Sequence, residues 1–553
     1  MVFLNKTYKT YGTYRTYKSY RTYQTNKAML IHELKDKTIA IVGFAREGQD
    51  TLLALQKLLP KKEIEKNGIG VFDANQDSFK RCPFKGQKVK GYSGENYLKE
   101  LKNYQVVIKT PGIPLAKIKP FLGRGAIMTS QTEVFFDNFK GLCVGVTGTK
   151  GKGTTATLIY QILKEAGFKV KLVGNIGKPV LGEFLKTLYP QGAKILIQQN
   201  DLLGSAPPQN DGRGNTQNDR SSEEVFVYEL SSYQVEGLKR IKKSPQIAVF
   251  LNLFPDHLDY YKNFKAYKKA KEPIFSFQGK NDFFIYNAED KTAREFARKS
   301  QAKKISFNRI PLKVKTKLKG DFNLLNIKAA FVVGRLLGVG ENTMKKTIAN
   351  FKGLEHRLEY VGKFKGIDFY NDSMSTLPEV AVKAIEAVRP QTLIAGGSCK
   401  GSDYKEMAKA IIKYKVKNLV LLEKQKEILI QQNDPVGSPL NNKSTIVSLL
   451  LKRDSSPSAQ NDIHCRHPEG GTTEGSLKRD SSVETGELLL TSLKGFKGKV
   501  FRTSKMKEAV EIAFRETKRG GACLLSPGAA SFNLFKDYAH RGGEFKRSVK
   551  VAK

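Results

Sequence analysis

The sequence predicts an α/β protein built from parallel sheets. Seven short runs rich in apolar and β-branched residues mostly end in glycine, proline or a polar residue, and helical patterns separate them. These runs are Thr38–Gly43, Val106–Thr110, Leu142–Thr147, Val225–Leu230, Ile247–Asn252, Thr392–Gly396 and Ala522–Ser526. At roughly 100–200 residues per domain, the 553-residue length suggests three or four units, each with its own core. Ligands bind beyond the carboxyl ends of parallel strands, so the residues after each run are the first functional candidates.

Composition excludes several classes of protein. An apolar content of 40% excludes wholesale disorder, and no run approaches the roughly 18 uncharged apolar residues of a membrane span. We expect no secretory signal, because the first residues lack an apolar segment. Five widely spaced cysteines without CxxC spacing predict a reduced, cytoplasmic protein with neither a disulfide framework nor a zinc knuckle. The formal charge of +42 predicts attraction to nucleic acid, anionic lipid or phosphorylated substrates.

Three segments differ from the rest in composition. Residues 7–24 form six consecutive triplets with tyrosine in the middle, and we interpret residues 1–36 as a disordered basic tail. An alternative is an arm that stacks on single-stranded nucleic acid or lies on a membrane. Segments of about 198–222 and 431–497 share the triplet Gln-Asn-Asp and lack a fixed repeat period, so we interpret both as surface insertions in loops.

The strongest local signal is a phosphate-binding loop at residues 147–155, Thr-Gly-Thr-Lys-Gly-Lys-Gly-Thr-Thr. A strand precedes it and a helical pattern follows it, so backbone N–H groups and the ammonium of Lys152 can surround phosphate oxygens. A serine or threonine that binds Mg²⁺ usually follows the lysine, whereas this chain has Gly153. Thr154 or Thr155 can supply that hydroxyl, or the metal relies on other ligands.

Two strand ends downstream carry metal ligands. Glu229 ends one apolar run, and Asp256 and His257 follow the next. Mg²⁺ takes few protein ligands besides water and phosphate, so one carboxylate and one imidazole suffice. Together with the phosphate-binding loop, these residues predict a nucleotide–metal site.

At this level of detail the sequence resembles the Mur ligase family, and within it the members that add D-glutamate. The motifs that carry the resemblance are TGTKGKGTT, GNIG (174–177), ELSSYQ (229–234), NLFPDHLD (252–259), YKKAKEPIF (267–275), FNLLN (322–326), GLEHRLE (353–359), NDSMST (371–376), AGGSCKG (395–401) and LLSPGAASFNLFKDYAHRGGEF (524–545). IAIVGFAREG (39–48), VFDAN (71–75) and VIKTPGIP (107–114) are similar to the uridine-nucleotide domain of that family. Besides Gly153, the sequence departs from the family at Phe322, where many relatives have histidine, and at Met374, where some have lysine and others an aliphatic residue.

The resemblance implies a role for each matching residue. ATP would be bound by Gly148, Thr149, Lys150, Gly151, Lys152, Gly153, Thr154, Asn323, Asn326, Arg357 and Asp372. Mg²⁺ would be held by Glu229, His257, Thr154 and Lys271, the last as a carbamylated lysine. The substrates would be held by Gly43, Asp73, Gly112, Asn175, Ser231, Thr376, Lys400, Ser531 and Tyr538. Lys152, Lys271, His257 and Arg357 would be the catalytic residues.

The resemblance also implies three domains and a reaction. They would be a Rossmann-like uridine-nucleotide domain at 37–137, a P-loop ATPase-type domain with a parallel sheet at 138–354, and a Rossmann-like amino-acid-binding domain at 355–553. The expected reaction is the ATP-dependent addition of D-glutamate to UDP-N-acetylmuramoyl-L-alanine, by a monomer in the cytoplasm. One alternative is another Mur-type or folylpolyglutamate-type ligase. Another is an inactive relative that binds nucleic acid or anionic surfaces through its tail.

Overall fold

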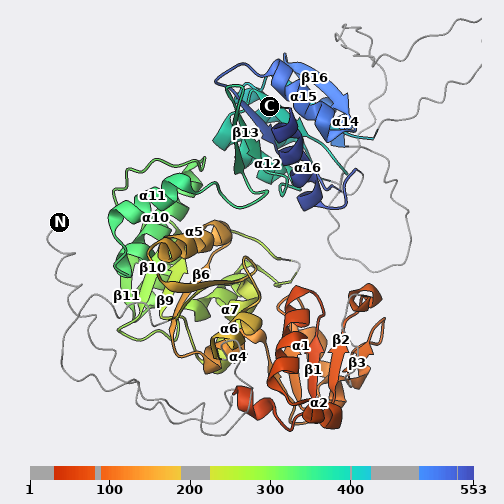
Figure 1. Cartoon of the computed structure of the whole chain (residues 1–553), viewed down its shortest axis with the longest axis vertical. Helices are drawn as coiled ribbons and strands as arrows, with labels where there is room; N and C mark the ends of the chain where they lie inside the picture. The colour runs from red at the N-terminus through yellow and green to blue at the C-terminus, as the bar shows by residue number, and fades with distance from the viewer. Residues whose placement is uncertain are drawn as a thin grey trace, which may run out of the picture.

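The computed structural model describes residues 30–80, 89–188, 224–258, 260–398, 402–424, 485–531 and 534–552. Figure 1 shows three bodies that follow one another along the chain, each built around its own sheet. The predicted α/β class is confirmed. Every one of the seven predicted runs contains a strand of the structure: β1, β4, β6, β8, β9, β14 and β17.

The first domain has a parallel five-stranded sheet in the order β3-β2-β1-β4-β5. Its elements are η1 (Ile31–Leu34), β1 (Ile39–Val42), α1 (Arg46–Leu58), α2 (Lys61–Asn67), β2 (Ile69–Phe72), η2 (Gln76–Phe79), β3 (Val89–Tyr92), η3 (Lys99–Asn103), β4 (Val106–Lys109), α3 (Leu115–Ile118), η4 (Lys119–Phe121), β5 (Ile127–Thr129) and α4 (Gln131–Asn138). All residues of β1, β2 and β4 are buried, as expected for parallel strands covered on both faces.

The start of the described chain corrects one predicted boundary. Residues 30–36 fall within the predicted tail, yet Ile31 and Leu34 of η1 are buried in the core of the first domain. The backbone N–H of Ile31 also donates to Asn138 Oδ1 at 3.0 Å. Apolar burial therefore includes η1 in the folded domain, and residues 1–29, with all the tyrosine triplets, lie outside the described residues.

The central domain has a parallel six-stranded sheet in the order β11-β10-β9-β6-β8-β7. Its elements are β6 (Leu142–Thr147), α5 (Lys152–Glu165), β7 (Lys169–Gly174), α6 (Val180–Leu188), β8 (Glu224–Glu229), α7 (Ser232–Ile241), β9 (Ile247–Phe250), α8 (Phe264–Lys271), η6 (Glu272–Ile274), β10 (Phe283–Tyr286), α9 (Lys291–Lys299), β11 (Lys303–Ser306), α10 (Asp321–Leu336) and α11 (Glu341–Asn350). β6 lies between β8 and β9, so the loop after it faces the ends of both neighbours.

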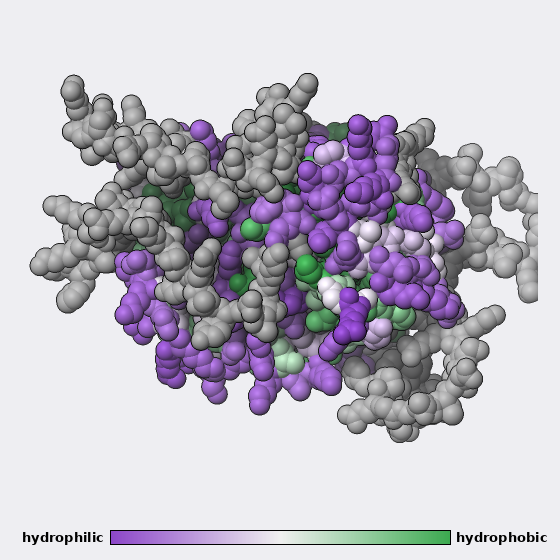
Figure 2. All heavy atoms as spheres, turned by 90° about the horizontal axis from the view of Figure 1, so that it is seen from below, coloured by the Kyte–Doolittle hydropathy of each residue, from purple (hydrophilic) through white to green (hydrophobic). Residues whose placement is uncertain are grey.

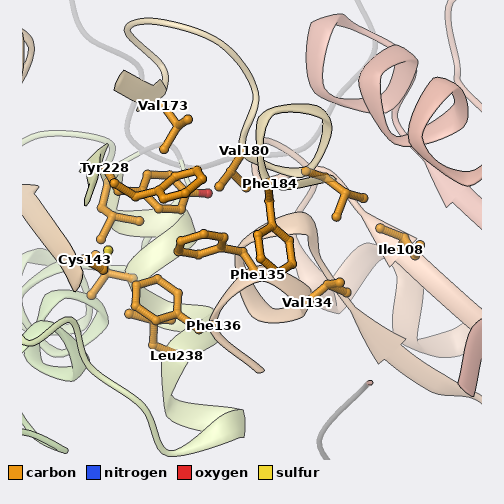
Figure 3. Packing of buried hydrophobic residues seen from close by; sticks show 14 of the residues in the cluster. Ile108, Val134, Phe135, Phe136, Cys143, Val173, Val180, Phe184, Tyr228 and Leu238 are labelled. Carbon is orange, nitrogen blue, oxygen red and sulfur yellow. The ribbon is translucent and has the colours of Figure 1, made fainter. Parts of the chain in front are cut away.

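Helix α4 joins the first two domains through aromatic packing. Figure 3 shows Phe135 and Phe136 of α4 among Phe184 and Tyr228 of the central domain. The ring centroid of Phe135 lies 5.4 Å from that of Phe184 and 5.7 Å from that of Tyr228. One continuous apolar cluster therefore spans both domains and fixes their contact.

The third domain has a six-stranded sheet in the order β12-β13-β17-β14-β15-β16, in which β12 alone is antiparallel to its neighbour. Its elements are β12 (Glu359–Phe364), β13 (Ile367–Asn371), α12 (Pro378–Val388), β14 (Thr392–Ala395), α13 (Lys405–Lys413), β15 (Asn418–Leu422), α14 (Thr485–Ser492), β16 (Lys499–Thr503), α15 (Met506–Glu516), β17 (Ala522–Leu525) and α16 (Tyr538–Val551). Residues 485–497 fall within the second predicted insertion, but Leu489 of α14 is buried in the domain core. That end of the predicted insertion is therefore wrong, because its apolar side chains complete the core.

The remaining parts of both predicted insertions, at 198–222 and 431–484, lie outside the described residues. In Figure 2 the coloured residues on one face of the molecule are mostly hydrophilic, with small hydrophobic patches between them. Within the described ranges, no helix combines the length and apolar character needed to cross a membrane.

Candidate functional site

The loop between β6 and α5 has the shape expected of a phosphate-binding loop. Gly151 precedes α5 with a φ of +89°, a left-handed conformation that favours glycine. A Cβ at this position would lie 2.3 Å from Asn326 Oδ1, so α10 approaches the loop closely. The end of β9 holds the other side, because the N–H of Thr149 donates to Asn252 O and that of Lys150 to Asn252 Oδ1, both at 2.9 Å.

Lys152 folds back over this loop. Its Nζ donates to the carbonyl oxygens of Gly148 at 3.0 Å and Thr149 at 2.9 Å. Burial lowers the pKa of Lys152, while the Glu229 carboxylate acts in the opposite direction. Its ammonium is therefore held where a phosphate oxygen could replace the carbonyl partners.

Lys271, at the end of α8, is a second lysine at the same loop and is only 1% exposed. Its Nζ donates to Thr147 Oγ1 and Gly148 O, both at 3.2 Å. Burial and the neighbouring Lys152 hold its pKa well below the ordinary value, against the opposing effects of Glu229 and Asp256. A lowered pKa favours the neutral amine, which is the nucleophilic form of lysine.

Glu229 is the last residue of β8, and His257 lies in the loop that follows β9, as predicted. Glu229 is buried, and its Oε2 accepts from the N–H of Asn175 at 3.1 Å. His257 has a φ of +56°, a strained conformation for a non-glycine residue that is often found at functional sites. In the described part of the chain, no group of three or more His, Cys, Asp or Glu side chains could hold a metal ion. A carboxylate and an imidazole still fit Mg²⁺ when phosphate and water supply the other ligands.

Asn323 and Asn326 are brought together on α10 beside the phosphate-binding loop. Asn326 Nδ2 donates to Asn323 Oδ1 at 3.2 Å, and Thr155 Oγ1 donates to Asn326 Oδ1 at 3.3 Å. The Thr155 hydroxyl therefore already has a hydrogen-bond partner. Thr154 is buried at the third position of α5. Gly153 has no room for a side chain, since its Cβ would lie 2.7 Å from Ile176 Cγ1.

Arg357 and Asp372 have different surroundings. Arg357 is exposed, its Nη2 lies 3.4 Å from Met374 Sδ, and its charge contributes to lowering the pKa of Lys152. Asp372 is buried and accepts from the N–H of Leu358 at 3.0 Å and from Ser526 Oγ at 2.9 Å. Burial raises the pKa of Asp372 to about 6. The carboxylate of Asp372 thus anchors the segment that carries Arg357.

A cavity of about 420 Å³ extends from the phosphate-binding loop to the first domain. Its lining includes the predicted residues Lys152, Lys271, His257, Asn175, Ser231 and Gly112. Gly43 and Asp73 are not among its lining residues, but Asp73 Oδ2 accepts from the N–H of Phe44 at 2.6 Å, next to Ala45 of the lining. The cavity therefore connects the two sites that the sequence predicted separately.

The residues predicted to hold the amino acid lie elsewhere. Thr376 is half-buried, Ser531 is buried and Tyr538 is exposed on the third domain, and none of these three lines the cavity. Lys400 lies outside the described residues. The structure therefore brings together the residues of the first two domains, whereas the described residues predicted to hold the amino acid do not line the cavity.

Three further polar residues were missed by the sequence analysis. Arg46 and Glu47 line the cavity from the first turn of α1, and burial raises the pKa of Glu47 to about 7. Arg541 is buried in the third domain, where its Nε donates to Ser373 Oγ at 3.0 Å and its Nη2 to Ser373 O at 2.9 Å. Arg46 lies in the glycine-containing turn after β1 and Arg541 in the HRGGEF motif, but nothing in either motif indicates the main-chain partners that these side chains bind.

Comparison with known proteins bears directly on the phosphate-binding loop and the strands beside it. Residues 146–310 match the family model described as the Mur ligase middle domain. The matched segment of this chain is therefore similar to the middle domain of the Mur ligases. It contains Lys152, Glu229, His257 and Lys271, and thus the end of the cavity at the phosphate-binding loop.

Curated relatives extend the similarity beyond this segment. A UDP-N-acetylmuramoylalanine--D-glutamate ligase of Symbiobacterium thermophilum is 29% identical over 83% of this chain and 87% of its own length. A protein of the same name from Caldanaerobacter subterraneus is 28% identical over 94% and 99%. Among solved structures, a UDP-N-acetylmuramate-alanine ligase of Thermotoga maritima is 15% identical, with a TM-score of 0.49, over 94% of this chain and 100% of its own. The predicted resemblance to the Mur ligases is confirmed by the sequence matches.

Proposed function

We propose that this protein is an ATP-dependent ligase that adds D-glutamate to UDP-N-acetylmuramoyl-L-alanine in the synthesis of a peptidoglycan precursor. One structural observation carries the proposal: a single cavity joins the first domain to a phosphate-binding loop flanked by two buried lysines, Lys152 and Lys271. The relatives that match most of the chain bear the name of this ligase. We expect a cytoplasmic monomer.

The ATP phosphates would lie on the loop at residues 148–154. Lys152 would exchange its two carbonyl partners for phosphate oxygens, and the N–H groups at the start of α5 would bind the same anion. Asn323 and Asn326 would meet the adenine side of the nucleotide. Arg357 would add positive charge when the third domain approaches, because its field already reaches Lys152.

Mg²⁺ would be held by Glu229, His257 and the hydroxyl of Thr154, with carbamylated Lys271 as a further anionic support. The bound ion would supply positive charge that offsets the charge of the transferred phosphoryl group. A neutral Lys271 amine can form an N–C bond with carbon dioxide and release one proton, which turns a cation into an anion. The lowered pKa of Lys271 supports this assignment, because it increases the fraction of neutral amine.

The reaction needs two steps because a carboxylate is a poor electrophile. The substrate carboxylate first attacks the terminal phosphorus of ATP, which gives an acyl phosphate and ADP. The amine of D-glutamate then attacks the acyl carbon, and phosphate leaves as the amide forms. Thr376, Lys400 and Ser531 would hold the D-glutamate carboxylates, with Tyr538 nearby. A third domain that closes over the cavity would exclude the water that hydrolyses an acyl phosphate.

The test is phosphate release from ATP with UDP-N-acetylmuramoyl-L-alanine and Mg²⁺. D-glutamate, L-glutamate, L-alanine and meso-diaminopimelate are compared as acceptors. Release that depends on D-glutamate alone is the expected result. Phosphate release with another acceptor would still indicate a ligase but would reject its specificity for D-glutamate. No release with any acceptor would reject the proposed function.

A further inference from the structure

A second cavity, of about 840 Å³, lies in the third domain at the amino ends of β14, β15 and β16. Gln391 precedes β14, Lys417 precedes β15, and the carboxyl end of α15 completes the wall. Among the described residues, none that has a predicted role lines this cavity. Thr376 and Ser531, predicted to hold the amino acid, follow the carboxyl ends of β13 and β17. Because these five strands are parallel, the cavity and the predicted amino-acid site lie at opposite edges of one sheet.

The wall of this cavity is strongly cationic. Six of its fifteen lining residues are lysine or arginine, compared with 95 of 553 in the whole chain, and Glu516 is its one acidic residue. Glu516 is already paired, since its Oε2 lies 2.8 Å from Lys499 Nζ and its Oε1 lies 3.0 Å from Arg515 Nε. The other four cations form no ion pair within the described part of the chain: Lys415, Lys417, Lys497 and Lys518.

Hydrogen bonds through Gln391 hold the lysine-bearing segments in place. The N–H of Lys417 donates to Gln391 O and the N–H of Lys518 donates to Gln391 Oε1, both at 2.9 Å. The N–H of Lys499 donates to Lys417 O at 2.8 Å, which sets the start of β16 beside the start of β15. Three separate segments are therefore fixed to one another, and a ligand would find their backbones already ordered.

The polar groups beneath these segments are already satisfied. Asn418 Nδ2 donates to Thr392 Oγ1 and to Glu516 O, both at 3.0 Å, and Thr392 Oγ1 lies 2.7 Å from Thr517 Oγ1. Asn418, Thr392 and Thr517 are all buried. The exposed ammonium groups are therefore the main groups left to bind a ligand.

Helix dipoles account for only part of this positive charge. Arg515 lies in the last turn of α15 and Lys518 follows that helix, where cations are favoured by the negative end of the dipole. Lys417 and Lys497 lie instead in the loops that lead into β15 and β16, beyond the last turn of any helix. Like charges on one concave wall repel one another unless an anion is bound between them.

We propose that this cavity is a second anion-binding site, which takes a small molecule with two or more linked phosphate groups. Linked phosphates can meet several separate ammonium groups at once. Small-molecule sites have volumes of about 300–1,000 Å³, so the size of this cavity favours a small ligand over a nucleic-acid strand. Phe496 lines the cavity and the Ile412 side chain is 41% exposed, so a nucleoside attached to the phosphates would find apolar surface there.

The test is titration calorimetry of the full chain with inorganic tripolyphosphate at low ionic strength. We expect Lys417→Met to weaken tripolyphosphate binding about 10-fold and Lys417→Met/Lys497→Met about 100-fold, because each charge-assisted hydrogen bond to phosphate contributes to affinity. Lys507→Met is the matched control, since Lys507 is an exposed lysine in the first turn of α15, at the other end of that helix from the cavity. Its tripolyphosphate affinity should stay within about two-fold of the native value.

The phosphate-binding loop of the central domain is a separate place for tripolyphosphate to bind. Lys152→Ala alters that loop, so the loss of affinity caused by Lys417→Met should persist in the Lys152→Ala background. Equal affinities of the native protein and Lys417→Met/Lys497→Met would overturn the inference. An equal loss in Lys507→Met would also overturn it, because attraction to the net charge of +42 would then explain the binding.

Two further ligands identify the source of the phosphates. Guanosine triphosphate that binds more tightly than tripolyphosphate, and does so through Lys417, would support a nucleotide as the ligand. Equal or weaker binding would support an inorganic phosphate chain. Single-stranded RNA bound through Lys417 by a protein that does not bind tripolyphosphate would overturn the assignment to a small molecule.

Discussion

The buried cations of the central domain and of the third domain are held in different ways. At the phosphate-binding loop, the Glu229 and Asp256 carboxylates oppose the fall in pKa of Lys152 and Lys271 that burial causes. In the third domain, burial lowers the pKa of Arg541 to about 10, and no carboxylate among the described residues opposes this shift. A lysine can lose its proton when it is buried, whereas arginine stays charged at any relevant pH. The two buried lysines of the central domain can therefore lose their charge, whereas Arg541 of the third domain keeps its charge.

The largest expected effect tests the lysine side of this comparison. Lys152→Ala removes the ammonium at the phosphate-binding loop, and we expect phosphate release to fall by about 10³-fold or more, because phosphoryl transfer depends on such charge. Lys164→Ala on the exposed face of the same helix removes an equal charge and is the control. Near-normal turnover of Lys152→Ala in a phosphate-release assay would reject the role of this loop.

Arg541→Lys keeps a positive charge in the third domain and tests the hydrogen bonds that the Arg541 guanidinium makes there. Arg541 joins two segments, since its Nη2 donates to Ser373 O at 2.9 Å and Ala529 O at 3.1 Å. Lysine cannot reach both carbonyl groups with the same geometry, so we expect unfolding free energy to fall by about 2 kcal/mol. We also expect the KM for D-glutamate to rise about 10-fold and that for ATP to change little, because Ser373 and Ala529 flank the predicted amino-acid site. An equal rise of both KM values would show that the change is not local.

These two regions also differ in how much of them the sequence reveals. The predicted runs became β6, β8 and β9, and their order along the sheet places Lys152 near Glu229 and His257, as the strand ends predicted. Arg46 and Arg541 were missed because most of their partners are main-chain carbonyl groups. Every residue has a carbonyl group, so no side-chain pattern in the sequence marks such a partner. Only the fold determines which carbonyl groups come within reach.

Glu47 extends the comparison to a buried acid. Its Oε1 has no hydrogen-bond partner among the described residues, and burial raises its pKa from 4.5 to about 7, against Lys109 and Arg46. An acid whose pKa is raised on folding keeps its proton longer in the native state. Stability is therefore lost as the pH rises from about 4.5 to about 7, and is constant above that range.

Glu47→Gln removes this titration. As the pH rises from 5 to 8, we expect the native protein to lose about 2 kcal/mol of unfolding free energy that the variant keeps. Urea unfolding at several pH values measures the difference, and Glu65→Gln on the surface of α2 is the control. A native-to-variant difference that does not change with pH would show that Glu47 has an ordinary pKa.

The smallest expected effect concerns Gly153, where the usual hydroxyl residue is missing from the phosphate-binding loop. A Cβ at this position would lie 2.7 Å from Ile176 Cγ1 and 3.0 Å from Leu354 Cδ1, so Gly153→Ser restores the common motif only by displacing both side chains. Leu354 Cδ1 ends a flexible side chain, whereas Ile176 Cγ1 is bonded to the branched Cβ and can move less, so we expect overpacking to cost about 1 kcal/mol in unfolding free energy. The same variant should raise the KM for ATP a few-fold, because Ile176 belongs to the loop at residues 174–177, which Arg46 holds by hydrogen bonds to its carbonyl groups.

Ile176→Val removes Cδ1, which would lie 3.2 Å from a Cβ at position 153, and shortens the branch that carries Cγ1, so this variant tests whether Ile176 is the cause. If Gly153 is required by Ile176, the double variant Gly153→Ser/Ile176→Val should recover part of the lost stability, with a coupling energy of about 0.5–1 kcal/mol. Thermal or urea unfolding of the four proteins measures this coupling. Additive effects would instead indicate that Leu354, on the segment leading to the third domain, is the side chain that excludes serine. The glycine would then preserve the contact with this connecting segment rather than the contact with the loop.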